Sequence, residues 1–227
     1  MSAKRPSLLI LDVNETLSDL TPLRGRFEEI GAPADLMPLW FAGILRDGFA
    51  LTAAGGYADF ADLARDGLRG LLTDTPHQPI HLEAAVRHVV SGFSELDVHP
   101  DVPAGVRALR AAGHRLVTMT NGSAALTDTL LDKAGVRDCF EALWDVTGPR
   151  LWKPHPRAYH YAAERSGVRP DEAMLVAVHP WDVDGAQRAG MAGAWLRRRT
   201  TTYPSSLTEP AIAVEDFIEL AHAIDCA

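Results

Sequence analysis

The sequence predicts an α/β protein in which helices cover a parallel sheet and an all-helical segment is inserted after the first strand. Three observations support this prediction. Residues 7–11 form an apolar run of strand length, residues 21–93 carry apolar side chains at helical spacing without a convincing strand, and segments of strand and helix character alternate after residue 101. Strands that alternate with helices are typical of βαβ units, whose strands run parallel.

The first strand is expected at Ser7–Leu11, because a continuous apolar run is typical of a strand that is buried on both faces. In the segment that follows, three groups of apolar residues recur three or four positions apart, as on one face of a helix. We therefore expect a helical domain over residues 19–96 and an α/β core formed by residues 1–18 and 97–227. The three groups are Leu36-Leu39-Trp40-Gly43-Ile44, Tyr57-Phe60-Leu63-Ala64 and Val86-Val89-Val90-Phe93.

The second part of the core is expected to alternate between helix and strand. Gly113, Gly135 and Gly167 follow three of the predicted helices, at the position where glycine commonly ends a helix. The polar segment 200–206 is expected to be a surface loop. In chain order the predicted elements are helix 102–112, strand 115–119, helix 123–134, strand 142–146, helix 157–166, strand 174–178, helix 182–189, strand 194–197 and helix 214–224.

Composition limits the class of protein. The chain has 227 residues, enough for one large domain or a domain with an insertion, and its formal net charge of −8 argues against a nucleic-acid partner. No segment approaches the roughly 20 apolar residues that span a membrane. The cysteines, Cys139 and Cys226, are too few for a disulfide framework. We therefore expect a cytoplasmic protein without a membrane or nucleic-acid partner.

Polar residues follow the predicted strands where the chain leaves the sheet. Asp12 follows the first strand, Thr120-Asn121-Gly122-Ser123 follows the second, Lys153 lies in the loop 151–156, and His179-Pro180-Trp181-Asp182 follows the strand at 174–178. Crossover connections place all these strand ends at one edge of the sheet. Open α/β sheets bind their ligands at that edge, so we expect these residues to converge on one crevice.

The order Asp, Thr/Ser, Lys, Asp, with a helical insertion after the first strand, resembles the haloacid dehalogenase superfamily. Within it the chain looks most like the (S)-2-haloacid dehalogenases, the type II 2-haloacid dehalogenases, through Lys153-Pro154-His155-Pro156-Arg157-Ala158-Tyr159 and Trp181-Asp182-Val183-Asp184-Gly185-Ala186. The resemblance implies a Rossmann-like core, an inserted helical cap, a substrate between the two, and a homodimer. It also implies an enzyme that hydrolyses short 2-haloalkanoic acids.

Two positions favour a reaction without a metal ion or another cofactor. Phosphatases of this superfamily hold Mg²⁺ with the nucleophile and with an aspartate four residues before the last aspartate. This chain has Val178 there, and an aliphatic side chain supplies no oxygen ligand. The phosphatase general acid lies two residues after the nucleophile, where this chain has Asn14, an amide that cannot shuttle a proton.

The resemblance implies a carboxylate displacement. Asp12 would attack the carbon that bears the halogen and form an ester. The halide needs no proton to leave, and water would then attack the ester carbonyl and regenerate Asp12. Lys153 would hold Asp12 ionised by its opposite charge, and Asp182 would position Lys153 and the hydrolytic water.

The remaining site residues are expected to orient these groups. Thr16 and Thr120 would orient the carboxylates, Asn121 would donate further hydrogen bonds, and Tyr159 would lie near the nucleophile. Thr120 and its neighbours are also expected to cap the following helix, whose amino end presents amides to an anionic substrate. The predicted substrate-binding residues are Val13, Asn14, Trp40, Phe41, Thr120, Asn121 and Tyr159.

Three positions depart from the family's pattern. The family carries an arginine after the tryptophan of the first insertion helix, whereas here Phe41 follows Trp40 and the nearest arginine is Arg46. The edge of a phenyl ring contacts a halide favourably but supplies no charge. His179 stands where the family has asparagine, and Ala177 stands where it has serine. Near neutral pH a histidine accepts a proton from water, so His179 has either a catalytic or a structural role.

Two alternatives remain open at this point. One is a phosphatase with an atypical metal site, which a Mg²⁺-dependent hydrolysis of phosphate esters would favour. The other is a non-catalytic or binding protein that keeps the fold, which an inert Asp12 would favour.

Overall fold

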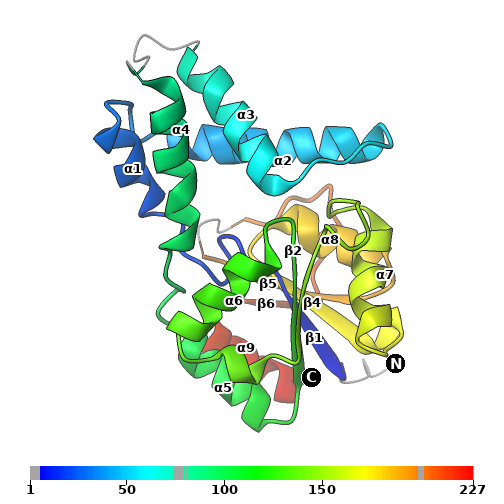
Figure 1. Ribbon diagram of the computed structural model, residues 1–227. Coiled ribbons are helices and arrows are strands. Elements are labelled where there is room, and N and C mark those ends of the chain that lie inside the picture. The colour runs from blue at the N-terminus through cyan, green and yellow to red at the C-terminus, as the bar shows by residue number, and fades with distance from the viewer. Residues whose placement is uncertain (1–5, 74–78, 80, 199–201, 227) are drawn as a thin grey trace. The chain divides into compact units, whose positions relative to one another are not determined.

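The computed structural model describes residues 6–73, 79, 81–198 and 202–226 and divides the chain into two compact units (Figure 1). The core unit combines Met1–Ser18 with Asp97–Ala227, and the helical unit is Asp19–Leu96.

The described residues of the core unit form one parallel sheet of six strands in the order β3-β2-β1-β4-β5-β6. The sequence prediction of an α/β fold with a parallel sheet is therefore confirmed. The strands are β1 (Leu8–Leu11), β2 (Arg115–Thr120), β3 (Ala142–Asp145), β4 (Ala173–Ala177), β5 (Ala192–Leu196) and β6 (Ile212–Val214).

Helices cover both faces of this sheet. Figure 1 shows α5 and α9 side by side on one face, and α7 and α8 on the other. Two of the helices begin with proline, which lacks the N–H that a first turn leaves unpaired. The core helices are α5 (Val102–Ala111), α6 (Ala124–Lys133), α7 (Pro156–Arg165), α8 (Pro180–Arg188) and α9 (Phe217–Cys226), with short 3₁₀ turns at Arg137–Cys139 and Pro170–Glu172.

Strand β1 is the centre of the core. All four of its residues are fully buried, which explains the continuous apolar run. Leu9 pairs with Leu116 of β2 on one side and with Met174 of β4 on the other. The chain thus leaves β1 between strands that lead to opposite halves of the sheet, the position at which doubly wound folds bind ligands.

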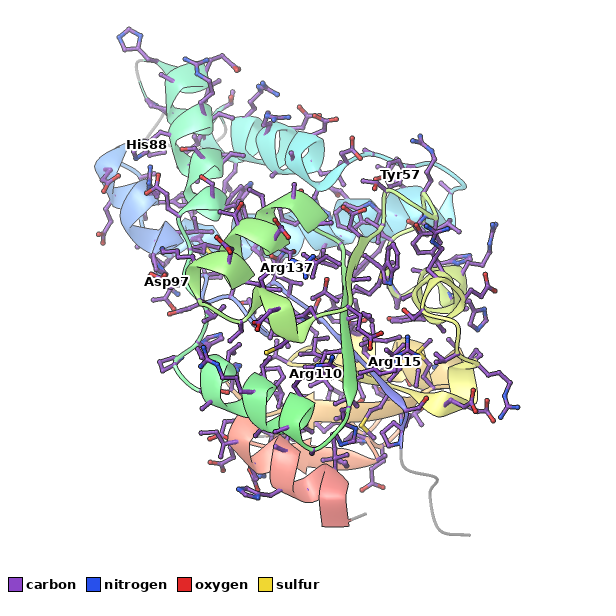
Figure 2. All side chains as sticks on the ribbon, turned by 60° about the horizontal axis from the view of Figure 1, so that its bottom comes forward. Tyr57, His88, Asp97, Arg110, Arg115 and Arg137 are labelled. Carbon is purple, nitrogen blue, oxygen red and sulfur yellow. The ribbon has the colours of Figure 1, made fainter. Side chains whose placement is uncertain are left out.

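The amino ends and the carboxyl ends of the strands carry different charged groups. Arg115 opens β2, and its guanidinium donates to both carboxylate oxygens of Glu141 at 3.1 and 2.9 Å. Arg110 lies 4.0 Å from the same carboxylate, and Figure 2 labels both arginines. This cluster marks the amino ends of the strands, so it is remote from the edge at which Asp12 leaves β1.

In the described residues of the helical unit there is no strand, as the spacing of its apolar residues predicts. Trp40 lies in the interior of this unit. Its indole N–H donates to the carbonyl of Ala64 at 2.8 Å, and its ring lies 5.7 Å from that of Phe27 and 5.8 Å from that of Phe93. The helices are α1 (Leu23–Glu29), α2 (Leu36–Ala53), α3 (Phe60–Thr73) and α4 (Leu82–Ser91), followed by a 3₁₀ turn at Gly92–Ser94.

The carboxyl-terminal region differs from the sequence prediction. Residues 212–214 form the edge strand β6, and α9 begins at Phe217 instead of residue 214. A strand of three residues that pairs on one side only is too short to show a period of two. The helix predicted at 182–189 begins earlier, at Pro180, and the strand predicted at 194–197 is Ala192–Leu196.

The segment 200–206 is more than a polar surface loop. Residues 200 and 201 lie outside the described residues. Tyr203 packs edge-on against Trp195, with ring centroids 5.1 Å apart, and its hydroxyl donates to the carbonyl of Pro180 at 3.2 Å. This segment is therefore anchored to the start of α8.

None of the helices built from the described residues is long and apolar enough to cross a membrane.

We predict that Gly105→Ala destabilises the core unit. A Cβ at position 105 in α5 would overlap the Cβ of Phe217 and lie 2.6 Å from its carbonyl carbon, so α5 and α9 would have to separate. Overpacking of this kind costs about 1–3 kcal/mol, measurable by urea unfolding.

Gly70→Ala in α3 is the matched control, because a Cβ there meets no atom within 4 Å. It should be neutral or stabilising, since alanine is favoured over glycine in a helix by about 1 kcal/mol. Equal stability of Gly105→Ala and the wild type would contradict the close packing of α5 on α9.

Candidate active site

Asp12 lies directly after β1, and its backbone N–H still donates to the carbonyl of Val176 in the sheet, at 3.0 Å. Its side chain is almost fully buried. Oδ1 accepts a hydrogen bond from the Lys153 ammonium at 2.8 Å. Oδ2 accepts one from the Thr16 hydroxyl at 2.7 Å and lies 3.3 Å from Nδ1 of His179. The carboxylate is thus fixed in position by three side chains.

Lys153 is fully buried and joins two carboxylates. Its Nζ donates to Asp12 at 2.8 Å and to Oδ2 of Asp182 at 2.6 Å. The backbone around the lysine is fixed by Asn121: the Lys153 N–H donates to the amide oxygen at 2.8 Å, and the amide nitrogen donates to the Lys153 carbonyl at 3.2 Å. Asn121 therefore holds the loop that carries the lysine.

Asp182 lies in the first turn of α8, and its second oxygen is also occupied. Tyr159 of α7 donates its hydroxyl hydrogen bond to Oδ1 of Asp182 at 2.7 Å. Gly185 makes this contact possible, because a Cβ at that position would lie 2.6 Å from the Tyr159 hydroxyl and from the Cβ of Pro154. Burial, followed by the charge of Asp182, raises the pKa of Tyr159 well above its usual value, so the phenol stays protonated.

His179 lies between two carboxylates. Its Nδ1 faces Asp12 at 3.3 Å and its Nε2 faces Oε2 of Glu15 at 3.0 Å. The imidazole also stacks on Trp181, with ring centroids 5.2 Å apart. Sequence analysis missed Glu15, although its place three residues after the nucleophile is a signal that could have pointed to it.

Burial and charge set the ionisation of these groups. Burial alone would raise the pKa of Asp12, but Lys153 and then His179 outweigh it and hold that pKa well below its usual range. Burial would likewise lower the pKa of Lys153, yet Asp12 and Asp182 raise it above its ordinary value. Burial also opposes the charge on His179, and the hydrogen bonds to Asp12 and Glu15 overcome it and raise the pKa of His179 to about 9. The free site therefore holds an ionised Asp12 beside two cations.

Thr16 connects the loops after two neighbouring strands. Its hydroxyl donates to Asp12 and accepts the backbone N–H of Val178 at 3.0 Å. The carbonyl of Thr16 accepts a hydrogen bond from Arg198 at 3.1 Å. Thr16 therefore fixes the orientation of the Asp12 carboxylate relative to the end of β4.

Thr120 is the last residue of β2, and Val13 and Asn14 lie in the loop after β1 at the same edge. The hydroxyl of Thr120 accepts the Gly122 N–H at 2.9 Å, so it shapes the turn before α6. Ser123 caps that helix by accepting the N–H of Leu126 at 3.4 Å. Contact of Thr120, Val13 and Asn14 with a substrate stays a prediction, as does that of Trp40 and Phe41, which belong to α2 of the helical unit.

Among the described residues, no group of three or more His, Cys, Asp or Glu side chains is arranged to hold a metal ion. Val178 offers only its backbone at the position where the superfamily's phosphatases carry an acidic residue, and its N–H is already bound to Thr16.

We predict that Lys153→Met destabilises the protein strongly at neutral pH, by about 3–5 kcal/mol, because it leaves the buried Asp182 carboxylate without a cation and Asp12 with His179 alone. The loss should shrink as the pH falls toward about 4. In the variant the buried Asp182 has lost its cation, so its pKa rises further and the group becomes neutral. The wild type still keeps most of the stability of its ionised Asp12 at that pH, because this stability is lost only as the pH falls below the unfolded pKa of about 4. Urea unfolding at pH 7 and pH 4.5 measures both effects.

Lys133→Met is the matched control. Lys133 pairs with Asp97 at 2.7 Å, but the two side chains are 49% and 72% exposed, so its loss should cost less than about 1 kcal/mol. A loss for Lys153→Met that is equally small, or that does not depend on pH, would contradict the buried ion cluster.

Comparison with known proteins places this geometry in a family. Residues 7–190 match the model of a haloacid dehalogenase-like hydrolase family. Haloacetate dehalogenase H-2 of Moraxella sp. (strain B) is 27% identical over 226 residues, which cover 97% of this chain and 99% of the relative. (S)-2-Haloacid dehalogenase 1 of Pseudomonas sp. (strain CBS-3) is 30% identical over 197 residues, with 83% of each chain covered.

A solved structure shares the fold. The L-2-haloacid dehalogenase from Xanthobacter autotrophicus with chloropropionic acid covalently bound matches with a TM-score of 0.87 at 22% identity, over 97% of this chain and 98% of that one. The resemblance predicted from the ordered motifs is confirmed by the family match and by these relatives, which are hydrolases of carbon–halide bonds. The chain therefore belongs to the haloacid dehalogenase-like hydrolases.

Proposed function

We propose that this protein hydrolyses the carbon–halogen bond of short 2-haloalkanoic acids through an ester on Asp12. One observation carries the proposal: the buried Asp12 carboxylate, held ionised by Lys153 at 2.8 Å, at the carboxyl end of the central strand. A carboxylate that is ionised at all working pH values is ready to attack carbon without help from a base.

The hydrogen bonds of Asp12 favour one of its oxygens as the nucleophile. Among the described residues Oδ1 accepts from Lys153 alone, whereas Oδ2 accepts from Thr16 and faces His179. Oδ1 therefore keeps a lone pair for the attack. A departing halide needs no proton, which agrees with an amide, Asn14, at the position of the phosphatase acid. Asn14 and Val178 therefore do not support a metal-dependent phosphatase.

The relatives suggest the class of substrate. Their names specify haloacetate and (S)-2-haloacids, so we propose small acids that carry the halogen next to the carboxyl group, with Thr120, Asn121, Tyr159, Val13 and Asn14 around them. A cytoplasmic homodimer completes the proposal, from the low cysteine content and the resemblance to dimeric dehalogenases.

We predict halide release from at least one haloacetate or 2-halopropionate by the wild type, and none by Asp12→Asn. Asp171→Asn, an exposed residue paired with Arg169 at 2.9 Å, should keep full activity. Both enantiomers of each 2-halopropionate are tested, and ion chromatography measures the halide.

The ester leads to a second expected result. In a single turnover in ¹⁸O-labelled water, the hydroxy acid should carry unlabelled oxygen from Asp12, and the label should appear in the peptide that contains Asp12. Label in the hydroxy acid instead would mean direct attack by water. Halide release from no member of the panel, with Mg²⁺-dependent hydrolysis of phosphate esters, would refute the proposed function.

A further inference from the structure

We propose that Glu15 and His179 form a proton-accepting pair for the second half of this reaction, in which Nδ1 of His179 takes the proton from the water that attacks the Asp12 ester and Glu15 orients the imidazole. The inference rests on the proposed function. It adds one residue, Glu15, and assigns His179 and Glu15 to the second half-reaction, the hydrolysis of the ester.

The geometry supports the pair. Glu15, His179 and Asp12 form a line of carboxylate, imidazole and carboxylate, with 3.0 Å between Glu15 and Nε2 and 3.3 Å between Nδ1 and Asp12. If Glu15 accepts the hydrogen of Nε2, the lone pair of the neutral imidazole lies on Nδ1, which faces the reacting carboxyl group. The side chains of His179 and Glu15 are 14% and 18% exposed, so the pair is shielded without being closed to water.

Glu15 adopts an unusual backbone conformation to reach the histidine. Its φ is +63°, in the left-handed region that residues with a side chain rarely occupy. Its carbonyl lies 3.0 Å from Nε2 of His99, which fixes the turn from outside. Disfavoured conformations persist where the surroundings enforce them, and they concentrate at functional sites.

The charges of the site provide a reason for the pair to act only after the ester has formed. In the part of the chain that the structure describes, the imidazole is faced by Asp12 from the end of β1, Glu15 from the following loop and Trp181 from α8. In the free enzyme the two carboxylates raise the pKa of His179 to about 9, so the histidine is protonated and cannot act as a base. Esterification removes the charge of Asp12. The pKa of His179 then falls, and the histidine becomes a proton acceptor at neutral pH.

The protons balance over the cycle. Attack by Asp12 forms the C–O bond, breaks the carbon–halogen bond and releases halide, and His179 then loses one proton to the solvent. Water adds to the ester carbonyl while one of its protons passes to Nδ1. The bond between the carboxyl carbon of Asp12 and the ester oxygen then breaks. The hydroxy acid leaves with the other proton of the water. The enzyme regains an ionised Asp12 and a protonated His179, and the net products are the hydroxy acid, halide and one proton.

Asp182 is less suited to accept that proton. One of its oxygens accepts from Lys153 at 2.6 Å and the other from Tyr159 at 2.7 Å. Thr16, in contrast, stays bound to Oδ2 of Asp12, where negative charge develops as water adds. It is thus placed to stabilise the tetrahedral intermediate by its hydrogen bond.

The first test uses the free enzyme and needs no substrate. Asp12→Asn imitates the neutral, esterified residue, so the pKa of His179, followed by NMR of the imidazole signals, should fall from about 9 by about one to three pH units. Glu15→Gln should lower it as well, and His179→Gln assigns the signal among the nine histidines. Glu141→Gln, at the opposite edge of the sheet, should leave it unchanged. An unchanged pKa in Asp12→Asn would overturn the inference.

The second test separates the two half-reactions. With a haloacid that the wild type turns over, His179→Gln should release about one halide per active site and then stall, and mass spectrometry should detect the ester on Asp12. Its hydrolysis should slow by roughly 10²-fold or more, as expected for loss of a general base. Glu15→Gln should slow it less and move the lower limb of its pH profile to lower pH, whereas Glu141→Gln should match the wild type.

The outcomes distinguish the inference from the proposed function. If the wild type releases halide and both His179→Gln and Glu15→Gln hydrolyse the ester at the wild-type rate, the pair is not the base, and the proposed function stands. If the wild type forms neither halide nor ester with any haloacid, the proposed function fails and the inference fails with it.

Discussion

The buried ammonium of Lys153 is the interaction on which the rest of the site depends. Burying one cation costs several kcal/mol unless opposite charges and hydrogen bonds satisfy it. Here Asp12 and Asp182 do so at 2.8 and 2.6 Å. Without the lysine, Asp182 would lose its cation and Asp12 would keep only His179. The nucleophile's charge and the connection of α8 to the end of β1 through the lysine are therefore two results of the same arrangement.

The fold supplies this arrangement from distant parts of the chain. Asp12 follows β1, Lys153 lies in a loop fixed by the Asn121 amide after β2, and Asp182 lies in the first turn of α8 after β4. Parallel strands bring their carboxyl ends to one edge, so three segments meet there although long stretches of chain separate them. Thr16 completes the connection with one hydroxyl that is bonded to both the β1 and β4 sides.

The sequence was most informative where a residue's role is set by its position after a strand. The apolar run before Asp12 and the alternation of helices and strands predicted the sheet and its reactive edge. The three-residue strand β6 and the contacts of Tyr203 were missed, because they arise from packing that no local pattern encodes. Glu15 was missed for a related reason: its importance comes from a positive φ that turns its side chain toward His179, and a single sequence does not reveal such a turn.

Gly185 has a consequence for any attempt to move this chemistry to another scaffold. The hydrogen bond from Tyr159 to Asp182 needs two helices closer together than a side chain at position 185 would allow. A graft of the polar residues alone would therefore reproduce the list of functional groups and lose the spacing that joins them. The parts that have to be transferred together are therefore the first turns of α7 and α8 and Gly185, because the contact depends on the missing Cβ at position 185.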